Sequence, residues 1–151
     1  MQIWKTIIIG TYKSKDELLK ALGEKGIQVT DSKHMWDSPR FQLSKIQKEC
    51  KLVRISVMKM GFDKPALYED ICKKAQEIGL KLCPAEVAPQ LKIQYRQPRG
   101  EYLNIGMKLI DGSYFQIVFG FDYDIRFLRG NTYNPAVVKF ELDCEFIFCT
   151  D

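Results

Sequence analysis

The stretch Val138–Phe148, with the sequence VKFELDCEFIF, decides the predicted fold. Its even-numbered positions are all apolar, while the odd-numbered positions up to Glu145 carry Lys, Glu, Asp and Glu. Because successive side chains of a strand point to opposite faces, this period of two predicts a strand with one dry face and one acidic face. The side chains expected to face a common core are Val138, Phe140, Leu142, Cys144, Phe146 and Phe148.

The same alternation occurs earlier in the C-terminal part of the chain. Apolar residues alternate with others over Leu103–Leu109 and again over Phe115–Phe121, and Asp111-Gly112 between them is a favoured hairpin turn. The alternation continues through Tyr123–Phe127. Because side chains alternate with a period of two along a strand, the sequence predicts an antiparallel β-meander from about residue 103 onward.

The N-terminal part of the chain carries the helix signals. Ser14 and Glu17 have the spacing of a capping box, followed by a stripe of leucines at Leu18, Leu19 and Leu22. This pattern predicts a helix that begins after Ser14.

A second helix is expected between Pro65 and Gly79, with Ile71, Ala75 and Ile78 on its buried face. Farther on, Pro84 and Pro89 are expected to allow at most a short helix between them.

These patterns together predict one α+β domain over residues 1–151, a length that suits a single core. A basic, helix-containing N-terminal part is expected to pack on the C-terminal antiparallel β-meander. Both helices, including the Leu18/Leu22 stripe, are expected to cover the same face of the sheet as the apolar side chains of Phe115, Ile117 and Phe119.

Charge is distributed unevenly along the chain. Residues 1–100 contain 19 Lys and Arg against 11 Asp and Glu, whereas residues 101–151 contain 4 against 8. A basic half can contact nucleic acid or another anionic partner, but no run of five or six basic residues is present. Nucleic-acid binding by the basic N-terminal part is therefore one alternative function.

Five cysteines, an odd number, in a chain of this size favour free thiols in a reducing compartment. The longest unbroken apolar run in the N-terminal segment is Ile7–Ile9, far below the ~18 residues that a membrane span needs. We expect a cytoplasmic protein with no membrane partner.

The sequence offers few groups for catalysis or metal binding. His34 is the sole histidine, and neither a C-x-x-C pair nor a glycine-rich phosphate loop occurs. We expect no catalytic residue, no metal site and no cofactor. A small hydrolase or transferase is the remaining alternative, because Cys83 stands close to a possible helix start and acidic side chains recur along the predicted strands. Those acidic residues are Asp122, Asp124, Glu141, Asp143 and Glu145.

A polar segment between the helical part and the meander is the candidate binding site. It combines amides, arginines and tyrosines, which suit contacts with phosphate, peptide or base groups. The candidate binding residues are Glu86, Gln94, Tyr95, Arg96, Gln97, Arg99, Glu101 and Tyr102.

The same region carries a resemblance to known sequences. The string Glu77–Leu91 (EIGLKLCPAEVAPQL), followed by Gln94-Tyr95, Gln97-Pro98 and Gly100-Glu101, resembles a family of small bacterial proteins with no established activity. The N-terminal Trp4–Ile7 is similar to the start of the same family. The resemblance implies a bacterial intracellular protein and carries over no catalytic residue.

The leading hypothesis from the sequence is a non-enzymatic binding module whose partner is a protein or a small anionic ligand. It rests on the Cys83–Tyr102 segment and on the scarcity of catalytic groups.

Overall fold

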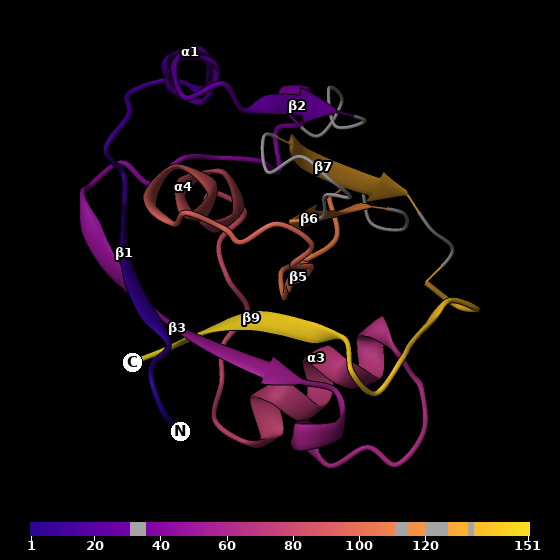
Figure 1. The fold of residues 1–151 in the computed structure, drawn as a ribbon. Coiled ribbons are helices and arrows are strands. Elements are labelled where there is room, and N and C mark those ends of the chain that lie inside the picture. Colours follow the sequence, from indigo (N-terminus) through magenta and orange to yellow (C-terminus); the bar gives the residue numbers. More distant parts are fainter. Residues whose placement is uncertain (31–35, 111–114, 120–126, 133–134) are drawn as a thin grey trace.

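The structure is a computed structural model, and it describes residues 1–30, 36–110, 115–119, 127–132 and 135–151 (Figure 1). Side chains are described for these residues except 30, 115–119, 127 and 129–132. The elements in chain order are β1 (Lys5–Ile9), α1 (Lys15–Glu24), β2 (Gln28–Thr30), β3 (Lys48–Ser56), η1 (Met58–Met60), β4 (Ala66–Leu67), α3 (Tyr68–Glu77), α4 (Val87–Gln94), β5 (Leu103–Ile105), β6 (Phe115–Phe119), β7 (Phe127–Thr132), β8 (Lys139–Phe140) and β9 (Glu145–Thr150).

The described strands form a mixed sheet rather than a pure antiparallel meander. Seven of them follow the order β1-β3-β9-β5-β6-β7-β2, and β4 pairs with β8 in a separate small sheet. The pairs β5–β9 and β2–β7 are parallel, while the other pairs of the large sheet are antiparallel. The predicted α+β class is confirmed. The predicted meander is wrong, because N-terminal strands lie at both edges of the large sheet.

The sheet curls around α4, which lies inside the curve beneath α1, whereas α3 lies on the outer side (Figure 1). Each side has its own buried cluster. Leu18, Leu22 and Leu91 belong to the inner one, and Ile71 and Ala75 belong to the outer one. The prediction that both helices pack on the same face is therefore wrong. The central strand β9 is buried on both faces, so helices cover it from both sides.

The Val138–Phe148 stretch is not one strand. It forms β8, a turn in which the Cys144 amide donates to the Glu141 carbonyl at 3.1 Å, and then β9. Phe146 and Phe148 are fully buried in the outer cluster, as predicted, and three other even-numbered residues pack partly buried against it. Those residues are Phe140, Leu142 and Cys144. The alternation is confirmed from Phe140 to Phe148, but Val138 is only half-buried and belongs to neither cluster, and the backbone turns between the two strands.

Beyond Glu145, the odd-numbered positions of β9 are buried as well. Ile147 and Cys149 belong to the inner cluster, opposite Phe146 and Phe148. This explains the unbroken apolar sequence FIFC, since a strand covered on both faces needs no polar side.

The β-hairpin is confirmed as a pairing. β5 and β6 are antiparallel, with Leu103 opposite Phe119 and Asn104 opposite Val118. Three other predictions for this region lie outside the described residues. They concern the Asp111-Gly112 turn, the alternation over Tyr123–Phe127 up to residue 126, and the side chains of Phe115, Ile117 and Phe119.

Ser14 caps α1 as predicted, but the Glu17 carboxylate bonds one residue earlier than the cap amide that a capping box uses. The Ser14 hydroxyl accepts from the Glu17 amide at 3.2 Å, and the Glu17 carboxylate accepts from the Lys13 amide at 2.9 Å. Leu18 and Leu22 are fully buried, as the leucine stripe predicts. The local spacing was therefore sufficient to place this helix.

The helix α4 is longer than the prolines suggested. Pro89 is its third residue, a position where the amide needs no partner within the helix, so the helix continues to Gln94. None of the described helices is long and apolar enough to cross a membrane.

Candidate functional site

Three polar side chains, spaced four residues apart, link α4 to residues 8–11 by hydrogen bonds. We call this set, Glu86, Gln90 and Gln94, the polar ladder. Glu86 is fully buried. One of its carboxylate oxygens accepts from the Gly10 amide at 2.7 Å and from the Gln90 side chain at 3.1 Å. The other oxygen accepts from the Ser44 amide at 2.7 Å. Glu86, a predicted binding residue, thus joins three segments of the chain instead of facing a ligand.

Gly10 makes this contact possible. Its φ is +77°, and a Cβ at this position would lie 2.0 Å from the Ile46 carbonyl oxygen. Only glycine allows the chain to pass so close to the 44–47 segment while its amide points at Glu86.

The third rung of the ladder is Gln94. Its side-chain oxygen accepts from the Ile8 amide at 2.9 Å, and its side-chain nitrogen donates to the Ile8 carbonyl at 2.7 Å. The same nitrogen donates to Gln90 at 2.9 Å. Because β1 is an edge strand of the described sheet, Gln94 occupies hydrogen-bonding groups that a further strand would use.

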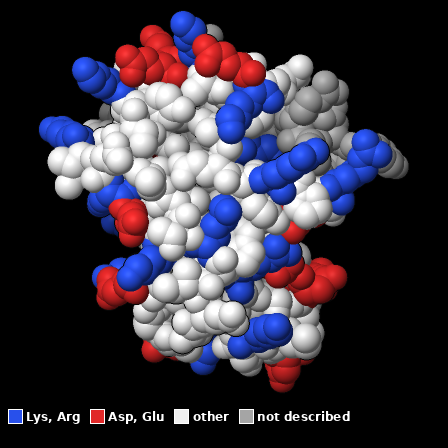
Figure 2. Space-filling model, turned by 60° about the vertical axis from the view of Figure 1, so that its left-hand side comes forward, with Lys and Arg blue, Asp and Glu red and all other residues white. Residues whose placement is uncertain are grey.

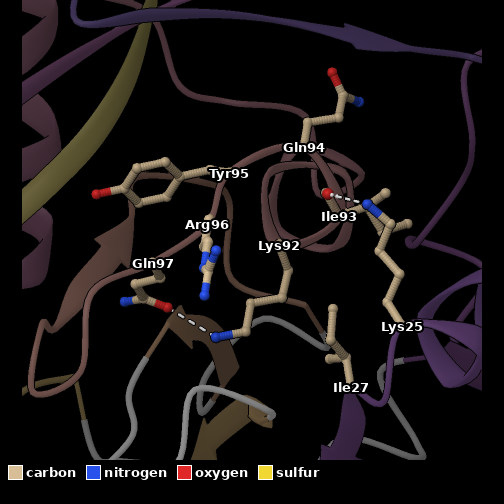
Figure 3. A pocket seen from close by; sticks show the side chains of 8 residues that line it. All are labelled: Lys25, Ile27, Lys92, Ile93, Gln94, Tyr95, Arg96 and Gln97. Carbon is tan, nitrogen blue, oxygen red and sulfur yellow. Dashed lines mark hydrogen bonds between the residues drawn. The ribbon is translucent and has the colours of Figure 1, made fainter.

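A cavity of about 390 Å³ opens at the C-terminal end of α4 (Figure 3). Its walls come from the segment between α1 and β2, the last turn of α4 and the segment that follows α4. The lining residues are Lys25, Ile27, Lys92, Ile93, Gln94, Tyr95, Arg96 and Gln97.

Three cations line this cavity. Lys92 is 5% exposed, and its amine donates to the Gln97 side-chain oxygen at 2.8 Å. Lys25 is exposed and donates to the Ile93 carbonyl at 2.9 Å, where a lysine complements the C-terminal end of a helix. Figure 3 shows the Arg96 side chain extending to the same side of α4 as Lys92. The eight described lining residues include these three cations and no carboxylate.

Two predicted residues belong to a neighbouring ion-pair network. Arg54 donates to both oxygens of Glu145, at 2.7 and 2.8 Å, and to Glu101 at 2.9 Å. The Tyr95 hydroxyl donates to Glu101 at 3.0 Å. The Trp4 ring packs edge-on against Tyr95, with 4.9 Å between the ring centroids, and lies 5.5 Å from the Arg54 guanidinium. The ring of Tyr95 is therefore held between the cavity and this network.

The network changes the acidity of its members. Hydrogen bonds from Arg54 hold the pKa of Glu145 below its ordinary value, and those with Glu145 raise the pKa of Arg54. Burial and the contact with Glu101 raise the pKa of Tyr95. Arg54 and Glu145 are therefore both charged near neutral pH.

We expect the protein to lose stability in acid through Glu145. A carboxylate whose pKa is lowered by folding contributes stability that is fully present above its unfolded pKa and is lost as the pH falls through its folded pKa. Glu145→Gln should therefore lower the thermal midpoint near neutral pH and flatten its decline below the ordinary carboxyl pKa of 4.5. Thermal melts at a series of pH values provide the measurement. The exposed Glu141→Gln is the control, and equal profiles for both variants would contradict the expectation.

The structure thus divides the predicted site. Gln94, Tyr95, Arg96 and Gln97 line the cavity. Arg99 and Tyr102 are exposed, and neither lines it. Glu86 and Glu101 bind other protein groups, as described above.

Sequence reasoning missed Lys25, Ile27, Lys92 and Arg54. Lys92 had a local signal, because it is the one charged residue within Val87–Gln94, whose other residues are apolar or amide. Lys25 and Ile27 had none, since the packing of α1 against α4 brings them to the cavity.

The groups considered for catalysis are not assembled among the described residues. Cys83 is buried in the inner cluster, and Glu141 and Asp143 lie in the turn before β9 rather than on one strand face with Glu145. Asp122, Asp124 and His34 lie outside the described residues. Within the described part of the chain, no group of three or more His, Cys, Asp and Glu could hold a metal ion.

Together, the fold and the site define an α+β protein with a cationic cavity at the end of a helix that a curled mixed sheet surrounds. Comparison with protein-family models, with curated proteins and with solved structures gives no match.

Proposed function

We propose that the protein is a non-enzymatic binding module that takes a small anion in the cavity at the end of α4. The observation that carries this proposal is the lining of that cavity, with three cations and no carboxylate among its described residues. Cations are suited to carboxylate or phosphate oxygens, which accept charge-assisted hydrogen bonds.

The volume of the cavity supports a small ligand. Pockets of ~300–1,000 Å³ are typical for small molecules, and this one is about 390 Å³. Arg96 is exposed and offers a planar fork of donors, which suits two oxygens of one anionic group. Ile27 and Ile93 add apolar surface for the remainder of an organic anion.

The partial burial of the site supports useful affinity. Lys92 is almost completely buried, and charges in such surroundings are less screened by water and salt than charges on an open surface. An anion beside Lys92 would therefore gain more from its charge than from that of an exposed lysine. The free thiols and the family resemblance favour a bacterial cytoplasmic protein. Small carboxylates and phosphates are available in that compartment.

Nucleic-acid binding is the less supported alternative. Figure 2 shows basic side chains across the middle of the face that it presents, separated in places by uncharged surface, and acidic side chains mainly toward its edges. Duplex recognition needs several phosphate contacts in a row, and these give a steep salt dependence. A compact cavity suits a small anion better.

The test compares two exposed arginines three residues apart. Arg96 lines the cavity and Arg99 does not. Isothermal titration calorimetry of the wild-type protein, Arg96→Ala and Arg99→Ala with citrate and with inorganic phosphate measures binding directly. We expect binding of at least one of the two anions, weakened ~10-fold or more by Arg96→Ala, because a hydrogen bond to a charged group contributes ~1.5–3 kcal/mol.

Arg99→Ala should leave the affinity unchanged, and circular dichroism should show both variants to be folded. Equal losses in the two variants would indicate a diffuse charge effect and would contradict the assigned site. Absence of binding for both anions, with tight and salt-sensitive binding of single-stranded RNA or DNA, would favour the alternative.

A further inference from the structure

Three buried thiols meet on the inner face of the sheet. Cys50 comes from β3, Cys149 from β9 and Cys83 from the segment that precedes α4. All three belong to the inner cluster and are at most 9% exposed. All five cysteines of the chain are free thiols in the structure.

Cys149 is the centre of the group. Its thiol donates to the Cys83 sulfur at 3.2 Å, and Cys83 in turn donates to the Ile147 carbonyl at 3.5 Å. The backbone fixes this approach, because Lys81 and Cys149 form an antiparallel bridge that places Cys83 two residues farther along, on the same face. The Cys83 amide also donates to the Gly106 carbonyl at 2.7 Å.

Cys83 is 4% exposed, less than Cys149 and Cys50 at 8% and 9%, but it is the one of the three that borders a cavity. It is one of the residues lining a second cavity, of about 750 Å³, together with apolar neighbours such as Leu82, Met107 and Ile110. Neither Cys50 nor Cys149 lines this cavity. We take this cavity as the route by which a small neutral oxidant such as a peroxide reaches Cys83.

We propose that Cys83 and Cys149 are a peroxide-oxidisable dithiol that closes into a disulfide bond. In the first step the Cys83 sulfur, after losing its proton, attacks a peroxide oxygen, and the oxygen–oxygen bond breaks to give Cys83 sulfenic acid and water. In the second step the Cys149 sulfur attacks the Cys83 sulfur, the sulfur–oxygen bond breaks and a second water leaves with the Cys149 proton. Two thiols lose two hydrogens, and one peroxide becomes two waters.

The geometry favours this pair over the alternative with Cys50. The two sulfurs already lie 3.2 Å apart, and a disulfide bond of about 2.0 Å needs only a small further approach. Hydrogen bonding to Cys149 and burial raise the pKa of Cys50. The hydrogen bond with Cys50 lowers the pKa of Cys149, but the bond with Cys83 and burial outweigh it, so that pKa is raised as well. Cys50 and Cys149 are therefore protonated at neutral pH, which makes both poor nucleophiles toward a peroxide.

The test is to treat the folded wild-type protein with hydrogen peroxide at neutral pH, unfold it in an alkylating reagent and map the cysteines by proteolysis and mass spectrometry. We expect a peptide in which Cys83 and Cys149 are joined, with the mass of two hydrogens lost, and its disappearance after reduction. Cys72→Ser should leave the link unchanged, because Cys72 belongs to the outer cluster on the opposite side of the sheet. Cys149→Ser should abolish the link and let a sulfenic-acid probe label Cys83.

The wild-type experiment decides the proposal even if a variant fails to fold. Alkylation of all five cysteines after peroxide treatment, a link between Cys50 and Cys149, or irreversible oxidation of Cys83 without a link would each overturn it. The outcome is independent of anion binding at the end of α4.

Discussion

Glu86→Ala should destabilise the protein by ~3–5 kcal/mol, since buried donors that lose their acceptor each cost about 1–3 kcal/mol. The change leaves the Gly10 and Ser44 amides without the carboxylate oxygens that lie 2.7 Å from each of them. Gln90 keeps its contact with Thr11 at 2.8 Å and loses only the contact with Glu86. A loss of this size is a large share of the ~5–15 kcal/mol that stabilises a typical domain.

Urea unfolding followed by circular dichroism measures this effect. Glu86→Gln should lose less than Glu86→Ala, because an amide keeps one acceptor oxygen of the same size. Glu24→Ala, at an exposed position of α1, is the control and should change stability little. A Glu86→Ala variant within about 1 kcal/mol of the wild type would contradict the role assigned to Glu86, since one lost hydrogen bond alone costs about that much.

Phe146→Ala should destabilise the protein by ~3–5 kcal/mol, the range for removing a fully buried phenylalanine. Phe146 is completely buried between α3 and the sheet. Its ring centroid lies 5.1 Å from that of Phe140 and 6.1 Å from those of Tyr68 and Phe148. The surrounding rings are held by both the small sheet and β9, so they cannot collapse fully into the space that is left.

Two variants from the same stretch make this prediction specific. Phe140→Ala should cost clearly less than Phe146→Ala, because Phe140 is only half-buried at the end of β8. Glu141→Ala should cost little, since its side chain is exposed in the turn. Equal losses for Phe140→Ala and Phe146→Ala would indicate the continuous strand that the sequence alone suggested.

Local patterns predicted the parts of the fold that depend on neighbouring residues. The helix cap at Ser14, the leucine stripe of α1 and the buried face of Phe146 and Phe148 all follow from spacing within a few residues. Gln94, Tyr95, Arg96 and Gln97 of the candidate segment line a cavity, and their role in binding stays a prediction.

The arrangements that depend on distant residues could not be predicted from the sequence, for physical reasons. A period of two shows which face of a strand is apolar, but it cannot show a turn such as that at Glu141, where the chain leaves one sheet for another. Parallel pairing of β5 with β9 and of β2 with β7 depends on which strands meet, and no local signal encodes it. The contribution of Lys25 to the cavity depends in the same way on how two helices pack.

Some side chains of the candidate site have a structural role and others line the cavity. The amino-acid types alone do not distinguish these two groups. A buried Glu86 and a solvent-facing Arg96 are both polar residues of one segment in the sequence. Only the hydrogen bonds of Glu86 to Gly10 and Ser44 distinguish it as part of the framework.

The central claim is that an anion binds at the end of α4, and the most direct measurement is a titration of isotopically labelled wild-type protein with citrate and with phosphate, followed by amide NMR spectra. We predict shifts that saturate and that concentrate on the amides of Lys25, Ile27 and residues 92–97, which line the cavity. Amides of α3, on the far side of the sheet, should stay in place. Spectra that do not change, or shifts that grow without saturation and spread over lysines across the whole surface, would contradict the claim.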